Sequence, residues 1–192
     1  VYGLTKGQQS PTMLRNMRTK SMAAPAIKEG VNPIAAAISN NYTFVGMSYS
    51  NQVKHLVEMI HMAINHKGTS VINVLQPCPT YNDVFTDKFF KMRLRDLADL
   101  KPGYDPVVSK PEDRNAKVAE AYTVSLEGYM RLNPEDGERE CFKGLYYHDK
   151  TVLPLEMLWA EKIGPTALAK RNIYDPRRKD AVRDLMNNFR RI

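Results

Sequence analysis

The residues best suited to chemistry stand at the start of the chain. Residues 1–12 read VYGLTKGQQSPT and place two glycines, small polar side chains and Lys6 in one short loop. Glycine tolerates positive φ and lets the backbone come close to a bound group, and exposed N–H and hydroxyl groups suit an anion. Taken alone, such a loop is more often an ordinary connection after a strand than a binding site. Arg15, Arg18 and Lys20 follow it and are basic enough to contact an anion or an acidic partner.

One cysteine is a candidate metal ligand. Cys78 follows an apolar run and stands between Pro77 and Pro79. The prolines lack N–H donors and stiffen the chain, which helps to present a thiolate to a soft metal centre. The ordinary alternative is that a lone cysteine is a small buried hydrophobe. Cys141 matches no ligand motif, so we expect it to be structural.

A β–α–β unit is predicted to position this cysteine. Residues 42–47 and 69–75 are β-rich and apolar, as buried strands are. Between them, Ser50 or Asn51 is expected to cap a helix that runs to about residue 65. Its apolar residues recur at three- and four-residue spacing and form one face: Val53, Leu56, Val57, Ile60, Ala63 and Ile64. Two strands joined by a helix should lie parallel, which predicts an open, mostly parallel α/β sheet with flanking helices.

The remaining elements are less regular. Asn32 is an expected N-cap, with Pro33 at the first helical position of a helix over 32–38. Residues 85–100 and 116–130 are expected to be helical, and residues 144–147 form a short strand candidate. Residues from 166 onward form a polar, irregular tail.

The two motifs together resemble a known family. Residues 1–12 and residues 77–82, which read PCPTYN, resemble the thiamine-diphosphate-binding β subunit of archaeal and bacterial 2-oxoacid:ferredoxin oxidoreductases. The family carries both motifs in this order. The resemblance runs from Val1 to about Asn82 and thins to a scattered likeness around residues 144–147. It implies a thiamine-diphosphate-binding fold, of which this chain is the carboxy-terminal part.

The resemblance also implies site residues. The backbone carbonyl of Val1 stands where the family ligates Mg²⁺, and Gly3 and Leu4 would touch thiamine diphosphate, although Leu4 is otherwise an ordinary core leucine. Lys6 would bind a coenzyme A phosphate or the distal carboxylate of the substrate, and we favour coenzyme A. A solvated loop lysine remains the alternative. Cys78 corresponds to the fourth ligand of a [4Fe–4S] cluster, whose other ligands lie outside this chain.

The implied activity is oxidative decarboxylation of a 2-oxoacid, of the pyruvate or 2-oxoglutarate type, to acyl-CoA and CO₂. Electrons pass through the cluster to ferredoxin, and an α subunit completes the enzyme. The chain lacks the family's Gly-Asp-Gly segment, its asparagine ligand and the first three cluster cysteines. We therefore expect residues 1–100 to be the remaining part of the cofactor domain. Residues 101–192 would be an extension that packs on it or on the partner subunit, and the chain would be inactive alone.

Two other classes stay open. A cluster-free thiamine-diphosphate-dependent decarboxylase subunit would use the same fold, with a structural Cys78. A basic, non-catalytic interaction module would leave the opening loop without a purpose.

Composition and charge exclude some classes of partner. The net charge of +7 is concentrated at the two ends of the chain. No helix-turn-helix, RNA-binding sheet motif or zinc-finger spacing accompanies it, so we expect no nucleic-acid partner. No run approaches the ~20 apolar residues that cross a bilayer, and two cysteines make no disulfide framework. These features predict a cytoplasmic protein without a membrane partner. The four histidines, His55, His61, His66 and His148, show no metal-binding pattern.

Overall fold

The predicted β–α–β unit is present at the centre of the structure. This computed structural model describes residues 9–20 and 22–152. Strand β1 (Phe44–Tyr49) and strand β2 (Ser70–Leu75) are parallel, in register from Phe44↔Ser70 to Tyr49↔Leu75. Helix α2 (Val53–Asn65) connects them. Its N-cap is Gln52 and makes no side-chain capping bond, so the expected cap at Ser50 or Asn51 is wrong.

The long strand β6 (Arg139–Asp149) organises the rest of the sheet. It pairs antiparallel with β1 and parallel with β3 (Leu94–Asp96) and β4 (Val107–Val108). A short strand β5 (Arg131–Leu132) pairs antiparallel with it. The main order is β2-β1-β6-β3, and three of the five strand pairings are parallel. The α/β class with a mostly parallel sheet is confirmed.

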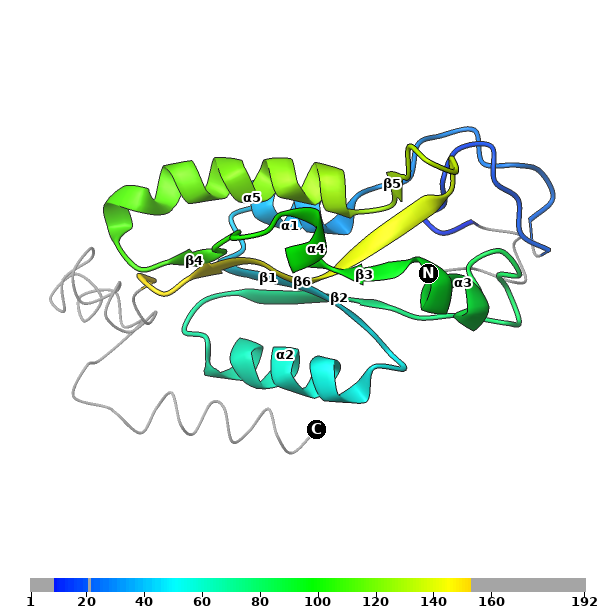
Figure 1. Cartoon of the computed structure of the whole chain (residues 1–192). Coiled ribbons are helices and arrows are strands. Elements are labelled where there is room, and N and C mark those ends of the chain that lie inside the picture. The colour runs from blue at the N-terminus through cyan, green and yellow to red at the C-terminus, as the bar shows by residue number, and fades with distance from the viewer. Residues whose placement is uncertain (1–8, 21, 153–192) are drawn as a thin grey trace, which may run out of the picture. The chain divides into compact units, whose positions relative to one another are not determined.

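Helices cover both faces of the sheet (Figure 1). Helix α1 (Pro33–Ser39) and helix α5 (Arg114–Gly128) lie on one face, and α2 lies on the other. Asn32 caps α1 as predicted, because its Oδ1 accepts bonds from the N–H groups of Ile34 and Ala35 at 3.0 and 3.1 Å. None of the helices in the described ranges is long and apolar enough to cross a membrane.

Residues 85–100 do not form the single helix that the sequence suggested. They form helix α3 (Asp87–Arg93), strand β3, and the short helix α4 (Leu97–Leu100). The interruption arises because residues 94–96 pair with β6, a contact that no local pattern signals. A 3₁₀ helix, η2 (Pro111–Asp113), leads into α5.

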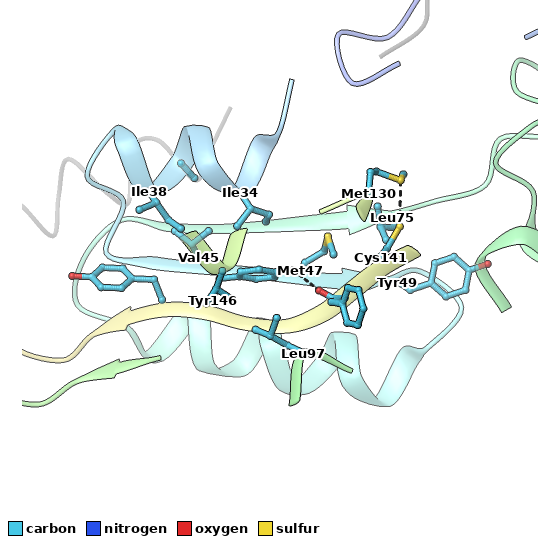
Figure 2. Close-up of a cluster of buried hydrophobic side chains, with 14 of the residues drawn as sticks. Ile34, Ile38, Val45, Met47, Tyr49, Leu75, Leu97, Met130, Cys141 and Tyr146 are labelled. Carbon is cyan, nitrogen blue, oxygen red and sulfur yellow. Dashed lines mark hydrogen bonds between the residues drawn. The ribbon is translucent and has the colours of Figure 1, made fainter. Parts of the chain in front are cut away.

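The core lies between the sheet and the α1–α5 layer. Figure 2 shows Ile34 and Ile38 of α1 near Val45 and Met47 of β1, with Tyr146 of β6 beside them. Every residue of β1 is buried, but in β2 only Leu75 is. The expectation of a buried second strand is therefore wrong for most of β2, because β2 lies at the edge of the described sheet.

The described residues belong to one compact unit that reaches residue 152. The described part of the expected extension contributes β6, which is hydrogen-bonded directly to β1. The division at residue 100, and the packing of residues 101–192 on the cofactor domain or a partner, stay predictions.

Candidate functional site

The carboxyl ends of β1 and β2 meet at one edge of the sheet, which is where open α/β sheets bind ligands. Cys78 lies there, three residues after the last residue of β2. The backbone N–H of Ser50, which follows β1, donates to the carbonyl of Leu75 at 3.0 Å. The start of the Cys78 loop (residues 76–86) is therefore held beside the end of β1.

Hydrogen bonds within the Cys78 loop fix its turn. The carbonyl of Cys78 accepts bonds from the N–H groups of Tyr81 and Asn82 at 3.1 and 2.8 Å. Asn82 is buried, and its Oδ1 accepts bonds from the N–H groups of Val84 and Phe85, both at 2.9 Å. Cys78 itself is half-buried with a free thiol. The turn thus holds the cysteine backbone in place and leaves its thiol half-exposed.

Lys20 connects the amino-terminal segment to this loop. Its ammonium donates to the carbonyl of Pro79, and its backbone N–H donates to Oδ1 of Asp83 at 3.0 Å. The sequence suggested an anion for Lys20, but the structure gives its ammonium a backbone carbonyl. Arg15 pairs with Glu29 at 3.6 Å, and Arg18 Nε donates to the carbonyl of Met22 at 3.1 Å.

Sequence reasoning missed a polar network at the same edge. The buried Tyr49 hydroxyl donates to Asp87 Oδ1 at 2.5 Å, and Asn51 Nδ2 donates to the same oxygen at 2.7 Å. Lys91 pairs with Asp87 Oδ2 at 2.6 Å. Burial, together with the Asp87 contact, raises the pKa of Tyr49 to about 12. Bonds from Lys91, Tyr49 and Asn51 lower the pKa of Asp87 to about 2.

This network anchors the other end of the Cys78 loop, because Asp87 is the first residue of α3. A signal was available in the sequence: Asn51 follows a predicted strand, and Thr86 precedes an acidic residue as an N-cap does. The pairing across 38 residues between Tyr49 and Asp87 had no local signal.

The other predicted site residues, Val1, Gly3, Leu4 and Lys6, lie outside the described residues. Their assignments stay predictions. Cys141 is fully buried in the core, where its Sγ lies 3.4 Å from the sulfur of Met130 (Figure 2). Burial raises the pKa of the Cys141 thiol to about 12, which is the opposite of what a thiolate ligand requires.

The described His, Cys, Asp and Glu side chains determine whether this part of the chain can hold a metal ion. Within residues 9–20 and 22–152, no group of three or more His, Cys, Asp or Glu side chains is placed to hold a metal ion. His66 and His148 form an edge-to-face ring pair with centroids 5.1 Å apart, and burial lowers the pKa of both. The described residues therefore do not make a complete metal site, and the assignment of Cys78 as a cluster ligand stays a prediction.

Comparison with known proteins supports the resemblance stated above. The chain is 45% identical over 162 residues to a 2-oxoacid:ferredoxin oxidoreductase subunit beta from Saccharolobus solfataricus, covering 84% of this chain and 50% of the relative. It is 54% identical over 132 residues to a subunit of the same name from Sulfolobus sp., covering 69% and 43%. The chain thus spans about half the length of the curated relatives it matches. No protein-family model matches it.

A solved structure supports the fold. A 2-oxoglutarate:ferredoxin oxidoreductase from Magnetococcus marinus, with 2-oxoglutarate, coenzyme A and succinyl-CoA bound, aligns with a TM-score of 0.65 at 22% identity. The alignment covers 96% of this chain and 54% of that one. The comparisons confirm that this chain is similar, over most of its length, to the β subunit of 2-oxoacid:ferredoxin oxidoreductases and shares their α/β fold.

Proposed function

We propose that this chain is part of the β subunit of a 2-oxoacid:ferredoxin oxidoreductase. The enzyme would carry out coenzyme A-dependent oxidative decarboxylation of a 2-oxoacid, of the pyruvate or 2-oxoglutarate type, to acyl-CoA and CO₂. Ferredoxin would receive the electrons. The observation that carries the proposal is the Cys78 loop, which lies at the carboxyl edge of the β1–β2 pair in a chain 45% identical to such a subunit.

Cys78 would hold one iron of a [4Fe–4S] cluster, with the other thiolates supplied from outside this chain. Iron–sulfur clusters are held by cysteine thiolates and transfer single electrons. The hydrogen bonds of the Cys78 turn and the Lys20 contact would hold the cysteine backbone in place. A ligand held this way would keep its place while the cluster supplies single-electron transfer. The Tyr49–Asp87 contact keeps α3, and with it the end of the loop, at the same edge.

The opening loop would hold the organic cofactor. Gly3 and Leu4 would contact thiamine diphosphate, and the carbonyl of Val1 would ligate Mg²⁺, a cation that prefers oxygen ligands. Lys6 would contact a phosphate of coenzyme A. Bound thiamine diphosphate supplies an electron sink for loss of CO₂. The contact of Lys20 with the Cys78 loop supports this arrangement, because it brings the segment after the opening loop beside the cysteine.

The proposed partners follow from the same reasoning. An α subunit would complete the substrate pocket, and ferredoxin would dock near the cluster. The cytoplasmic location stays a prediction.

A cluster-free decarboxylase subunit is the second candidate. The observation that favours it is that Cys78 is the one half-buried cysteine in the described residues, whereas Cys141 is buried in the core. A single available thiol cannot bind a cluster by itself. The basic interaction module loses support, because the relatives named above are enzyme subunits.

Iron and sulfide analysis of the natively purified complex, under anaerobic conditions, tests the proposal. We expect about four irons per β subunit in the parent complex and a loss or degradation of the cluster in Cys78→Ser. Cys141→Ala is the matched control, because it removes the buried thiol and should leave the iron content unchanged. An iron-free parent complex that still binds thiamine diphosphate would establish the decarboxylase alternative. Full iron content in Cys78→Ser would remove Cys78 from the site.

A further inference from the structure

One residue from a distant segment holds the Cys78 loop at two points. The ammonium of Lys20 donates to the carbonyl of Pro79, which directly follows Cys78. The backbone N–H of the same lysine donates to Oδ1 of Asp83 at 3.0 Å. The turn closed by the Cys78 carbonyl lies between these two contacts. Lys20 therefore spans the turn, and we call its two bonds the Lys20 clamp.

The Cys78 loop has few N–H groups left for the sulfur of Cys78. The prolines on both sides of the cysteine have no N–H, and the N–H groups of Tyr81 and Asn82 donate to the carbonyl of Cys78. Hydrogen bonds to the sulfurs and nearby charge both set the reduction potential of an iron–sulfur cluster. Where N–H donors are scarce, a neighbouring charge has the larger share of this control. Lys20 brings a positive charge to the residue that follows Cys78.

The sign of the effect follows from electrostatics. An ammonium attracts negative charge, so it stabilises the reduced state of a cluster, which holds one electron more than the oxidised state. Its presence therefore raises the reduction potential. Lys20 is exposed, and solvent and salt screen its charge, so the expected shift is modest. Asp83 carries the opposite charge, and its removal should have the opposite effect.

We propose that Lys20 is a positioning residue for Cys78 whose charge raises the reduction potential of the cluster that Cys78 would hold. This inference rests on the proposed function and deepens it, because it assigns control of the electron-transfer step to a residue outside both family motifs. A clamp that is only structural would depend on the hydrogen bonds alone. The charge of residue 20 would then leave the potential unchanged.

Redox titration of the natively purified complex tests the proposal. The electron paramagnetic resonance signal that is lost in Cys78→Ser identifies the cluster, and iron content is measured in parallel. Lys20→Gln removes the charge and keeps an amide donor. We expect full iron content and a reduction equilibrium less favourable by at least about threefold, which is about 28 mV at about 59 mV per tenfold for one electron. Lys20→Arg should match the parent, and Asp83→Asn should shift the potential upward.

Lys67→Gln is the matched control, because Lys67 is an exposed lysine that precedes β2, whereas Cys78 follows it. It should leave the potential unchanged. The inference is overturned if Lys20→Gln shifts the potential no more than this control, or if Lys20→Arg shifts it equally far. A downward shift in Asp83→Asn would also overturn it, since both variants would then act by disturbing the turn.

Two outcomes of the iron analysis separate this inference from the proposed function. Loss of iron from Lys20→Gln but not from Lys20→Arg would make the charge a condition for holding the cluster, and would overturn its role in the potential. An iron-free parent complex would refute the proposed function and this inference with it. A parent complex with its cluster, and a potential that Lys20→Gln does not move, would refute this inference alone.

Discussion

Alkylation of the two cysteines in the native chain tests the division of roles between them. We expect iodoacetamide to modify Cys78 and to leave Cys141 unmodified. The reason is that Cys78 is half-buried in a surface loop, whereas Cys141 is fully buried beside Met130. A cluster ligand must be available as a thiolate, and a core cysteine must not be.

The size of the difference follows from the burial of Cys141. Its thiol pKa is raised to about 12, so at pH 8 about one molecule in 10⁴ carries the thiolate that reacts. An unperturbed thiol, with a pKa of about 8.5, is about one quarter ionised at that pH. The lower thiolate population alone should slow the alkylation of Cys141 by about 10³ relative to that of an ordinary thiol. Steric burial slows it further, because the reagent has to wait for the core to open.

Peptide mass spectrometry over a time course at pH 8 measures both sites. The native chain should take up one label, at Cys78, and a second label should follow only in denaturant. Cys78→Ala should remain unlabelled until it is unfolded. Labelling of Cys141 in the folded chain at a rate comparable to Cys78 would refute the reasoning, since it would mean that the β5–β6 region opens freely or that Cys141 is not in the core.

Three further predictions concern stability, measured by urea unfolding. Gly46→Ala places a Cβ against the Met59 methyl group. It should lower the free energy of unfolding by about 1 kcal/mol, because the flexible methionine end can move aside. Met59→Ala should lower the free energy of unfolding by about 2–3 kcal/mol. The double variant should lose less than the sum of the two single losses, because the two side chains compete for one space. Asn32→Ala removes the α1 cap and should cost about 1 kcal/mol. Burial raises the pKa of both Cys141 and Tyr147 to about 12, above ordinary values of about 8.5 and 10. In the unfolded chain these groups lose protons first, so stability should be full below pH ~8.5 and fall as the pH rises toward 12.

Controls keep these three predictions separate. Additive effects of Gly46→Ala and Met59→Ala would contradict direct contact between the two residues. Asn32→Ser retains a capping oxygen and should recover most of the loss, and equal destabilisation by Ala and Ser would assign the effect to the bond from Asn32 Nδ2 to the Ser125 carbonyl at 2.9 Å. Cys141→Ala should flatten the alkaline loss between pH 9 and 10, and an unchanged slope would assign that loss to other groups.

Much of the fold was predictable where the determinants are local. The Asn32 cap with its proline, and the β–α–β unit with its apolar spacing, were predictable because each signal lies within a few residues of the chain. The eleven-residue β6 was predicted only over residues 144–147. Its length is set by partners distant in the sequence, β1 and β3, and the break of the 85–100 helix has the same origin. Pairing between distant segments leaves no periodic signal in either one.

Helix α2 shows that a periodic pattern predicts which residues share a face, but not what that face contacts. The pattern correctly placed Val53, Val57, Ile60 and Ile64 on one face, but it did not give what that face contacts. In the described structure Met59 is the buried residue of the helix, and these four side chains of the predicted face are exposed. A hydrophobic pattern reports the need for burial, and the partner that satisfies it can lie outside the segment or outside the described chain.

The sequence predicted the candidate ligand of the site, but not the residues that hold it in place. Cys78 stood out because two prolines flank it, and the carboxyl end of β2 then gave its place in the sheet. Lys20 reaches the carbonyl of Pro79 across 59 residues, and Asp87 reaches Tyr49 across 38. The segment that follows the opening loop is bonded to the residue next to Cys78, and the far end of the Cys78 loop is bonded to β1. The position of Cys78 therefore depends on residues that belong to neither motif. Substitution of Cys78 tests whether its sulfur is a ligand, whereas substitution of the residues that hold its loop tests only how the loop is positioned.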